Sequence, residues 1–326
     1  MAHIAIVGAT GNVGRQMLNQ LEEQKILVDK VTLYASEKSA GQRAIFKGQE
    51  IVVEELNKET IDATIDYALF SAGTDVALKY APYFNEKGIR VIDNSSAYRQ
   101  EDSVPLVVPE VNKADLSRRS LLIANPNCST IQAVIPLYVM QTLFGLKRVT
   151  YSTYQAVSGS GQAGVKALEE NNQGKEQTFY PKPIAGNVIP HIDAFLANGY
   201  TKEEQKMMDE TRKILDLPTL NVSATCVRVP VQNGHGVSVS VECQNAVHLE
   251  RLLHALTKQE GLVVMDTPDY PTPIEVNGKN QVYIGRVRHD QEDKHTVHFW
   301  CVADNLRKGA ATNAVQILNY LMEEKQ

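Results

Sequence analysis

His-Ile-Ala-Ile-Val at residues 3–7 runs directly into Gly-Ala-Thr-Gly-Asn-Val-Gly at residues 8–14. This order predicts a strand, a glycine turn and a helix over Gly11–Glu23. Glycines at such a turn let the backbone approach a pyrophosphate at the helix N-terminus. The spacing is not the usual Gly-x-Gly-x-x-Gly, and glycines kept for helix–strand packing would look similar. The strand–turn–helix context favours a dinucleotide site.

Short apolar runs alternate with a helical stretch through the rest of the first half. The expected strands are Lys30–Ala35, Asp66–Ser71, Arg90–Asp93 and Leu121–Ala124, with a helix at Val76–Lys87. Alternation at this spacing predicts an α/β fold with a Rossmann-type, doubly wound parallel sheet.

The second half of the chain is β-rich and alternating, which is typical of an α+β domain with a mixed or antiparallel sheet. The expected strands are Arg148–Ala156, Val222–Val231, Gly236–Gln244, Gln281–Val287 and His295–Ala303. The expected helices are Gly164–Asn171, Lys202–Leu215, His248–Thr257 and the amphipathic segment Gly309–Glu324. A length of 326 residues also favours two domains, with a boundary near residue 128.

Composition excludes several classes of protein. The chain is 43% hydrophobic and 22% charged with a net charge of −5, so it lacks the basic footprint of a nucleic-acid-binding protein. No apolar run approaches the roughly 20 residues that span a membrane, and the start of the chain has no signal-peptide pattern. The four cysteines are widely spaced without a Cys-x-x-Cys pair. This argues against bound metal and disulfides, and indicates a reducing cytoplasm.

Asn-Pro-Asn-Cys-Ser-Thr at residues 125–130 precedes an apolar run from Ile131 to Phe144. It predicts that Cys128 lies where a loop turns into a helix. Unpaired backbone N–H groups and the macrodipole there favour a thiolate and can hold an oxyanion. Cys128 is therefore a candidate nucleophile for covalent acyl chemistry, although most free cysteines are small buried hydrophobes.

A candidate base and a candidate anion clamp follow about a hundred residues later. His235 lies in the expected turn Gln-Asn-Gly-His-Gly (residues 232–236), and the imidazole pKa suits proton transfer near neutral pH. Arg228, seven residues upstream, has the fork geometry of a carboxylate clamp. A surface histidine and a structural ion pair are the alternatives. His295 at an expected strand start stays open as a second candidate.

The end of the second expected strand bears on which nucleotide binds. NAD sites usually carry an acid there for the ribose 2′-hydroxyl. Here Ser36, Lys38 and Ser39 have the chemistry to hold a 2′-phosphate, whereas Glu37 opposes it. The set favours NADP over a merely solvated turn.

Taken together these motifs resemble aspartate-β-semialdehyde dehydrogenase of the bacterial branch. The resemblance rests on the glycine turn, Asn-Cys-Ser-Thr at 127–130, and Cys-Val-Arg-Val-Pro at 226–230 with a histidine seven residues after its arginine. It extends over the whole chain through Ser-Ala-Gly at 71–73, Val-Val-Pro-Glu-Val-Asn at 107–112, Tyr-Gln-Ala-Val-Ser-Gly at 154–159 and Asp-Asn at 304–305.

The resemblance implies a reversible, NADPH-dependent reductive dephosphorylation of L-4-aspartyl phosphate to L-aspartate 4-semialdehyde in lysine, threonine and methionine biosynthesis. Cys128 would form the acyl-thioester, His235 would be the acid–base residue, and Gln155 would orient the intermediate. Arg228 would bind the substrate carboxylate. Arg99, helped by Asn127, would bind phosphate.

An acid and a lysine three residues apart on a helix also belong to the family pattern. Thr201 and Glu204 fit a capping box, which leaves Glu203 free to share a helix face with Lys206. Glu203 would then bind the substrate ammonium and Lys206 the phosphate, whereas a surface salt bridge is the ordinary alternative.

The implied cofactor contacts cover most of the nucleotide turn and several later loops. They are Gly8, Thr10, Gly11, Asn12, Val13, Ser36, Lys38, Ser39, Ser71, Ala72, Gly73, Ser158, Gly159, Asn305 and Gln316. The implied domains are an NADP-binding domain at 1–127, completed by the C-terminal helix 309–326, and a catalytic and dimerisation domain at 128–308. A homodimer or homotetramer is implied. Relatives often carry an arginine at the position of Lys38 and an aromatic residue at the position of Gly186.

Two other functions remain as alternatives. A related acyl-phosphate reductase of the N-acetyl-glutamyl-phosphate type, or a phosphorylating glyceraldehyde dehydrogenase, would keep the chemistry and change the substrate. A non-catalytic NADP-binding redox sensor would need the glycine turn but not the cysteine, histidine and phosphate-binding groups together.

Overall fold

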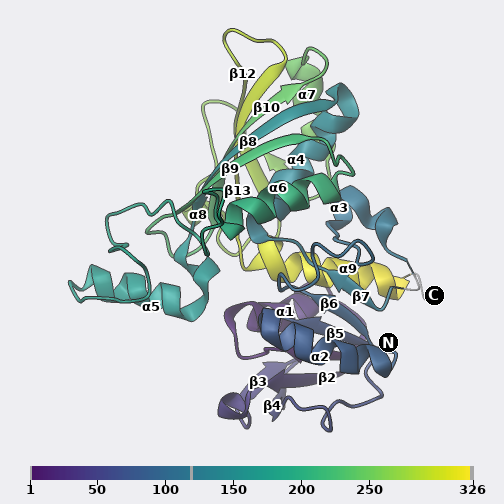
Figure 1. Ribbon diagram of the computed structural model, residues 1–326. Coiled ribbons are helices and arrows are strands. Elements are labelled where there is room, and N and C mark those ends of the chain that lie inside the picture. Colours follow the sequence, from purple (N-terminus) through teal and green to yellow (C-terminus); the bar gives the residue numbers. More distant parts are fainter. Residues whose placement is uncertain (1, 118–119, 324–326) are drawn as a thin grey trace. The chain divides into compact units, whose positions relative to one another are not determined.

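A computed structural model describes residues 2–117 and 120–323 (Figure 1). The last residue of the expected C-terminal helix, Glu324, lies outside this range. The chain forms two compact units, one of Met1–Pro126 with Ala310–Gln326 and the other of Asn127–Gly309.

The first unit contains a largely parallel sheet, as the sequence predicted. Its strands are β1 (Ala2–Val7), β2 (Val28–Ala35), β3 (Arg43–Phe46), β4 (Gln49–Glu55), β5 (Tyr67–Phe70), β6 (Arg90–Asp93) and β7 (Leu122–Ala124). Its helices are α1 (Asn12–Glu23), α2 (Thr74–Glu86), α3 (Pro109–Asn112) and α9 (Thr312–Glu323). The strand order is β3-β4-β2-β1-β5-β6-β7, and only β3 runs antiparallel to its neighbour.

Strand β1 lies at the point where the order of the sheet reverses. The chain moves from β1 to β2 on one side and later places β5 on the other. Nucleotides bind outside the carboxyl ends of parallel strands at such a switch point. The glycine turn follows the carboxyl end of β1, so the topology puts it where a dinucleotide would bind.

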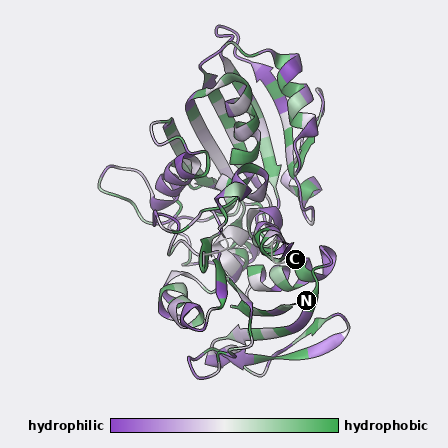
Figure 2. Ribbon diagram, turned by 90° about the vertical axis from the view of Figure 1, so that its right-hand side faces the viewer, coloured by the Kyte–Doolittle hydropathy of each residue, from purple (hydrophilic) through white to green (hydrophobic). Residues whose placement is uncertain are grey.

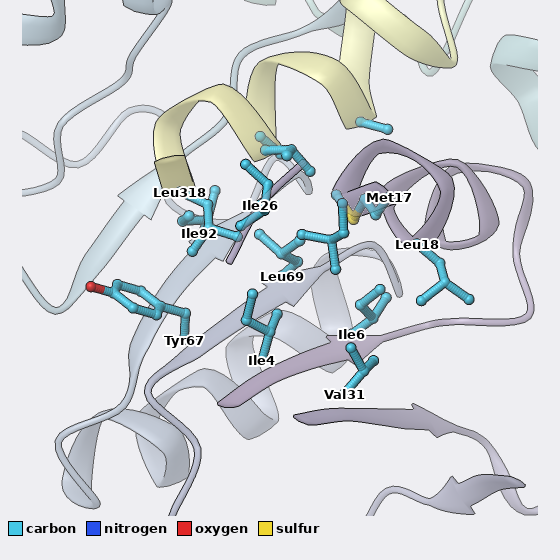
Figure 3. Close-up of a cluster of buried hydrophobic side chains, with 14 of the residues drawn as sticks. Ile4, Ile6, Met17, Leu18, Ile26, Val31, Tyr67, Leu69, Ile92 and Leu318 are labelled. Atoms are coloured by element: carbon cyan, nitrogen blue, oxygen red, sulfur yellow. The ribbon is translucent and has the colours of Figure 1, made fainter. Parts of the chain in front are cut away.

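A continuous hydrophobic core holds the first unit together (Figure 3). Ile4 and Ile6 from β1, Met17 from α1 and Leu69 from β5 are fully buried. Leu318 from α9 belongs to the same cluster although it lies near the other end of the chain. The C-terminal helix is therefore an integral part of this core.

The second unit contains a mixed sheet with the order β11-β12-β13-β10-β8-β9. Its strands are β8 (Leu146–Gln155), β9 (Asn221–Arg228), β10 (His235–Cys243), β11 (Leu262–Val264), β12 (Val282–His289) and β13 (Thr296–Ala303). Its helices are α4 (Cys128–Phe144), α5 (Gly161–Asn172), α6 (Lys202–Ile214), α7 (Leu249–Lys258) and α8 (Pro273–Val276). The pairs β8–β9 and β11–β12 are parallel, whereas the other neighbours are antiparallel.

Helices α4, α6 and α7 pack against this sheet. Helix α4 is mostly apolar, and Ile131, Val134, Ile135 and Leu137 are all fully buried. Such a helix is stable only inside a core. Hydrophobic and hydrophilic residues alternate along the strands of the sheet (Figure 2), which is the pattern of a sheet with one covered face.

Candidate active site

Three expected site residues meet where neighbouring strands of the second sheet end or begin. Gln155 ends β8 and Arg228 ends β9, and the two are register partners. His235 begins β10, which runs antiparallel to β8 with Gly236 opposite Tyr154. The side chains of Gln155, Arg228 and His235 are buried, with exposed fractions of 1%, 4% and 0%.

Two sequence expectations are wrong at these strand ends. Strand β9 ends at Arg228 and does not reach Val231. Pro230 explains the shorter strand, because it has no N–H to continue a ladder. His235 is the first residue of β10 and is not part of the preceding turn, so its backbone is fixed by strand pairing.

Cys128 is the first residue of helix α4, as expected, and its side chain is partly exposed. Asn127 is the N-cap, and its Oδ1 accepts hydrogen bonds from the N–H groups of Ser129 at 2.9 Å and Thr130 at 3.3 Å. The cap satisfies donors that were expected to hold an oxyanion.

Helix α6 fixes the capping residue from the opposite direction. The Asn127 amide donates to Glu203 Oε1 at 2.8 Å, and its backbone N–H donates to Glu210 Oε2 at 2.6 Å. Gln155 Nε2 donates to the same Oε1 of Glu203 at 3.2 Å. Glu203 thus joins Asn127, the residue before Cys128, to the end of β8.

The other three cysteines have a different environment. Burial raises the pKa of the Cys226 and Cys301 thiols far above the usual range, and raises that of Cys243 to about 11. These thiols are protonated at neutral pH and serve as core side chains. Cys128 remains the only one of the four that is not buried.

His235 is held by its own backbone and by a neighbouring strand end. Its Nδ1 accepts a hydrogen bond from the Ala156 N–H at 3.0 Å. Among the described residues, Nε2 has no hydrogen-bond partner. Complete burial, with the nearby charge of Arg228, lowers the pKa of His235 well below its usual value. The imidazole is therefore neutral at physiological pH.

Gly159 lies against both His235 and Arg228. A Cβ at this position would lie 3.0 Å from Arg228 Nη1 and 3.1 Å from His235 Nε2. The absence of a side chain lets the loop after β8 close over these two groups.

Gly159→Ala is therefore expected to lower kcat/KM by about tenfold or more, because displacement of catalytic groups by a fraction of an ångström is costly. Steady-state kinetics of the purified variant measures this, and its thermal midpoint should stay near that of the parent protein. Unchanged kinetics would show that the loop yields without moving Arg228 or His235.

Ser158 and Asn305, both expected to contact the cofactor, are engaged with each other and with the turn before His235. Asn305 Nδ2 donates to Ser158 Oγ at 2.9 Å, and Asn305 Oδ1 accepts from the Gly234 N–H at 2.8 Å. Asn233 accepts from Ser158 Oγ at 2.9 Å. These bonds give both residues a direct structural role in fixing the start of β10.

The acid and lysine of helix α6 have the expected local arrangement. Thr201 and Glu204 form the capping box, and Glu203 lies 3.6 Å from Lys206 Nζ across one helical turn. Lys206 Nζ also lies 2.7 Å from Asp193 Oδ2, a contact that the sequence did not predict. Burial opposes ionisation of Asp193, but hydrogen bonds from Lys206 and the Ala194 N–H outweigh it and lower its pKa.

Sequence reasoning also missed two buried side chains at this site. Gln132 Nε2 donates to the carbonyl of His235 at 3.1 Å, and Glu210 accepts from the backbone N–H of Asn127, next to Cys128. Gln132 is one helical turn after Cys128, and Glu210 is two turns after Glu203. The signal that could have identified them is a polar residue at helical spacing on an otherwise apolar helix face.

The glycine turn of the first unit borders a cavity of about 480 Å³. Gly8 has a φ of +84°, and a Cβ there would lie 2.8 Å from the Ser71 backbone. A Cβ on Gly14 would lie 2.2 Å from the Gly8 carbonyl oxygen. Both positions therefore require glycine, which leaves the cavity open and lets α1 pack closely on β1.

Only part of the expected cofactor set lines this cavity. Gly8, Thr10, Gly11, Ser36, Ser71 and Ala72 do so, together with Glu37. The expected residues of the first unit that are absent from its lining are Asn12, Val13, Lys38, Ser39, Gly73 and Gln316, and the three expected residues of the second unit, Ser158, Gly159 and Asn305, do not line it either. Val13 packs on the core, and Gln316 donates to Glu110 Oε1 at 3.0 Å.

Arg99 belongs to the first unit, in the loop that follows β6. It is 7% exposed, and its Nη2 donates to the Asn94 carbonyl at 2.8 Å. Asp93 nearby is buried, which raises its pKa despite hydrogen bonds from Ser95.

The structure also shows where His295 and Gly186 lie. His295 precedes β13 at the end paired with Glu242, whereas His235 pairs with Ala303 at the opposite end. His295 is thus not part of this site. Gly186 has a φ of +67°, which favours glycine over an aromatic residue there.

Within residues 2–117 and 120–323, no group of three or more histidine, cysteine or acidic side chains is arranged to hold a metal ion. In the same part of the chain, every helix is too short or too polar to cross a membrane.

Comparison with known proteins gives a consistent result. The family models described as semialdehyde dehydrogenase, NAD binding domain, and semialdehyde dehydrogenase, dimerisation domain, match residues 3–119 and 136–308. The aspartate-semialdehyde dehydrogenase of Aquifex aeolicus is 48% identical over 98% of both chains. That of Bacillus subtilis is 45% identical over 98% of this chain and 97% of its own.

Solved structures of similar proteins contain relevant ligands. Aspartate semialdehyde dehydrogenase II of Vibrio cholerae, complexed with ASA, superposes with a TM-score of 0.97 at 42% identity and covers 100% of this chain and 99% of its own. The Candida albicans enzyme with NADP gives a TM-score of 0.81 at 26% identity, with coverage of 100% and 99%.

Proposed function

Because the chain belongs to the aspartate-semialdehyde dehydrogenase family, we propose that it reduces L-4-aspartyl phosphate to L-aspartate 4-semialdehyde through a thioester on Cys128. Its activity is that of an aspartate-semialdehyde dehydrogenase in the biosynthesis of the aspartate family of amino acids. The first unit would bind the nucleotide, and the second would carry the reacting groups.

The reaction begins with attack of the Cys128 thiolate on the acyl carbon. A C–S bond forms, the C–O bond to phosphate breaks, and phosphate leaves with the electron pair. When bound, NADPH supplies the hydride that reduces the thioester. The resulting thiohemiacetal, which Gln155 would orient and for which His235 would act as the acid–base residue, then collapses to the aldehyde and returns the thiolate.

Charged groups would hold the two ends of the substrate. Arg228 is assigned to the α-carboxylate and Glu203 to the ammonium, whereas Arg99, Lys206 and Asn127 are assigned to phosphate. A buried carboxylate such as Glu203, 6% exposed, suits a free amino group. This supports an amino-acid substrate over an N-acetylated or sugar-phosphate one.

One observation carries the proposal: Glu203 ties Asn127, next to the nucleophile, to Gln155 beside His235 and Arg228. A redox sensor would not need such a connection. The test is an assay of the purified protein with aspartate semialdehyde, NADP and phosphate, followed by reduced-coenzyme absorbance. Turnover should need all three, and turnover of N-acetyl-glutamate semialdehyde instead would support the alternative substrate.

The preferred coenzyme is proposed to be NADP. The cavity has room for one end of a dinucleotide. Ser36, which lines the cavity, can donate a hydrogen bond to a 2′-phosphate. Glu37 also lines the cavity, whereas Lys38 and Ser39 lie just beyond its lining.

The expected result is a higher kcat/KM for NADP than for NAD. Lys38→Ala should lower the NADP value by roughly tenfold, since a charge-assisted hydrogen bond is lost, and should leave the NAD value unchanged. Glu37→Gln is the matched variant and should favour NADP further. A parent ratio near one, or one that favours NAD, would mean that Glu37 governs the choice.

The dimerisation surface is proposed to be the exposed face of the second sheet. Tyr154 on β8 and Trp300 on β13 are in edge contact at 5.6 Å, and Tyr154 is 42% exposed. On the same face, β8 and β10 present the paired residues Ser152 and Ser238 to solvent. Aromatic side chains and a lack of charge are typical of the core of protein interfaces. A homodimer is the simplest assembly, and sedimentation velocity measures it.

A further inference from the structure

The chain after strand β13 is fixed by the carboxylate of Asp304, the residue that follows the strand. This residue is 2% exposed. Its Oδ1 accepts hydrogen bonds from the backbone N–H groups of Leu306 at 2.9 Å and Arg307 at 3.2 Å. Its Oδ2 accepts from Asn233 Nδ2 and from the Gly278 N–H, both at 2.9 Å. Four hydrogen bonds offset the cost of burying this charge, and they tie the chain after β13 to two other loops of the second unit.

The segment that follows Asp304 forms one turn of π-helix over Arg307–Ala311. The Gly309 N–H donates to the Asp304 carbonyl at 3.1 Å, which is the i→i+5 spacing of such a turn. Turns of this kind are rare and occur frequently at functional sites. Asp304 thus helps to set the position of Gly309 through its backbone as well as through its side chain.

Gly309 lies directly against Cys128, although the two residues are far apart in the sequence. Both belong to the second unit. A Cβ at Gly309 would lie 3.0 Å from the Cβ of Cys128 and 3.4 Å from its Cα. The optimal separation of two carbon atoms is about 3.5–4.0 Å. A side chain at this position would therefore displace Cys128 by a few tenths of an ångström.

The backbone conformation does not by itself require glycine at this position. Gly309 is not among the glycines with a positive φ, and glycine is less favourable than alanine inside a helical turn. The next two residues, Ala310 and Ala311, are both alanines. What the structure shows at Gly309 is close packing, and the group packed against it is the candidate nucleophile.

We propose that Asp304 and Gly309 are positioning residues for Cys128. Asn127 fixes the start of helix α4 through the cap, and Gly309 limits where the Cβ of Cys128 can lie. The direction from which the sulfur meets an acyl carbon is then set before the substrate binds. Misplacement of a reacting group by about 1 Å can cost roughly a hundredfold in rate. The proposal rests on the proposed function for the reaction of Cys128, whereas the reactivity of its thiol is measured without substrate.

Gly309→Ala tests the contact with Cys128. Alanine suits a helical turn, so the thermal midpoint should stay within about 3 °C of the parent value. The kcat with aspartate semialdehyde, NADP and phosphate should fall by about tenfold or more, and the KM values should change by less than about twofold.

The second measurement on Gly309→Ala is the pH dependence of alkylation by iodoacetamide. The other three thiols are buried, so the reagent reports on Cys128. The apparent pKa of this thiol should rise, because a displaced sulfur loses part of the stabilisation that the helix start gives to a thiolate. A loss of general stability would not by itself move this pKa.

Gly145→Ala is the matched control, at the opposite end of helix α4. Gly145 has a φ of +70°, and a Cβ there would lie 3.1 Å from the side chain of Gln244. The variant should lose stability, since its backbone is strained, and should keep the kcat and the thiol pKa of the parent. An equal loss of kcat in both alanine variants would overturn the proposal, because any disturbance of α4 would then suffice.

Asp304→Asn tests the anchor, and it decides the question alone if Gly309→Ala does not fold. Asparagine keeps the size but has one acceptor oxygen in place of two, so hydrogen bonds of the anchor are lost. The kcat should fall by about tenfold or more and the thiol pKa should rise. Asp293→Asn is the control at the start of β13, where Asp293 accepts from the His295 N–H at 2.9 Å and the Thr296 hydroxyl at 2.8 Å. It should keep both parent values.

Parent values of kcat and of the thiol pKa in folded Gly309→Ala would overturn the proposal, and so would parent values in Asp304→Asn. A parent protein without turnover, whose thiol pKa still rises in Gly309→Ala, would contradict the proposed function and support the positioning role.

Discussion

Replacement of Cys128 by serine is expected to abolish turnover, with a loss on the order of 10⁴-fold or more, as for other covalent nucleophiles. A serine hydroxyl has a pKa far above that of a thiol and is not ionised by a helix N-terminus. The exchange changes one atom on a partly exposed side chain, so the fold and nucleotide binding should persist. Stopped assays with aspartate semialdehyde, together with NADP titration by fluorescence, measure both properties.

Cys226→Ala is the matched control. Its thiol is buried and protonated, so the variant should retain its catalytic rate and lose about 1–2 kcal/mol of stability from the cavity. Near-normal activity of Cys128→Ser would remove the thioester from the mechanism.

Replacement of Arg228 by lysine is expected to lower kcat/KM for the semialdehyde by about a hundredfold, or roughly 3 kcal/mol of lost charge-assisted bonding. The arginine already donates to the Ala156 carbonyl through Nη1, and its buried Nε has no partner in the described residues. Lysine keeps the charge but cannot hold the carbonyl and a carboxylate together in one plane. The positive charge of a lysine alone is therefore not expected to sustain binding of the semialdehyde.

Arg99→Ala separates the two anion sites. It should raise the KM for phosphate by ten- to a hundredfold and leave that for the semialdehyde nearly unchanged. KM approximates affinity only when chemistry is slow, so single-turnover rates accompany the measurement. If Arg99→Ala affected the semialdehyde alone, the two assignments would be exchanged.

The parts of the fold that sequence could predict are those with a strong apolar pattern. Strands such as β1 and helix α4 bury most of their residues, and their position follows from composition. The hairpin of β3 and β4 was missed because its residues are largely exposed and only two of them are buried. Its turn at Lys47 and Gly48 has positive φ at both residues, as two-residue hairpins require, but it lacks the usual Asn-Gly signal.

The candidate site divides in a similar way. Cys128, Arg228 and His235 stand in short motifs that can be read locally. The Gln132 contact with His235 joins residues 103 positions apart and exists only because β10 packs on α4 in one register. The Ala156 N–H that fixes the imidazole is a backbone group, and no residue type encodes it. Sequence therefore pointed to the candidate site residues but not to the contacts that hold them in place.

Helix α9 affects how this protein folds while it is being synthesised. Its Leu318 and Leu321 complete the core begun by Ile4, so the ribosome delivers the last piece of the first unit only after the entire second unit. At the usual rate of about 5–20 residues per second, the early strands wait roughly 10–40 s with their apolar faces uncovered. The second unit would therefore complete its fold before the first. A chain that ends a few residues early would leave the core of the first unit incomplete.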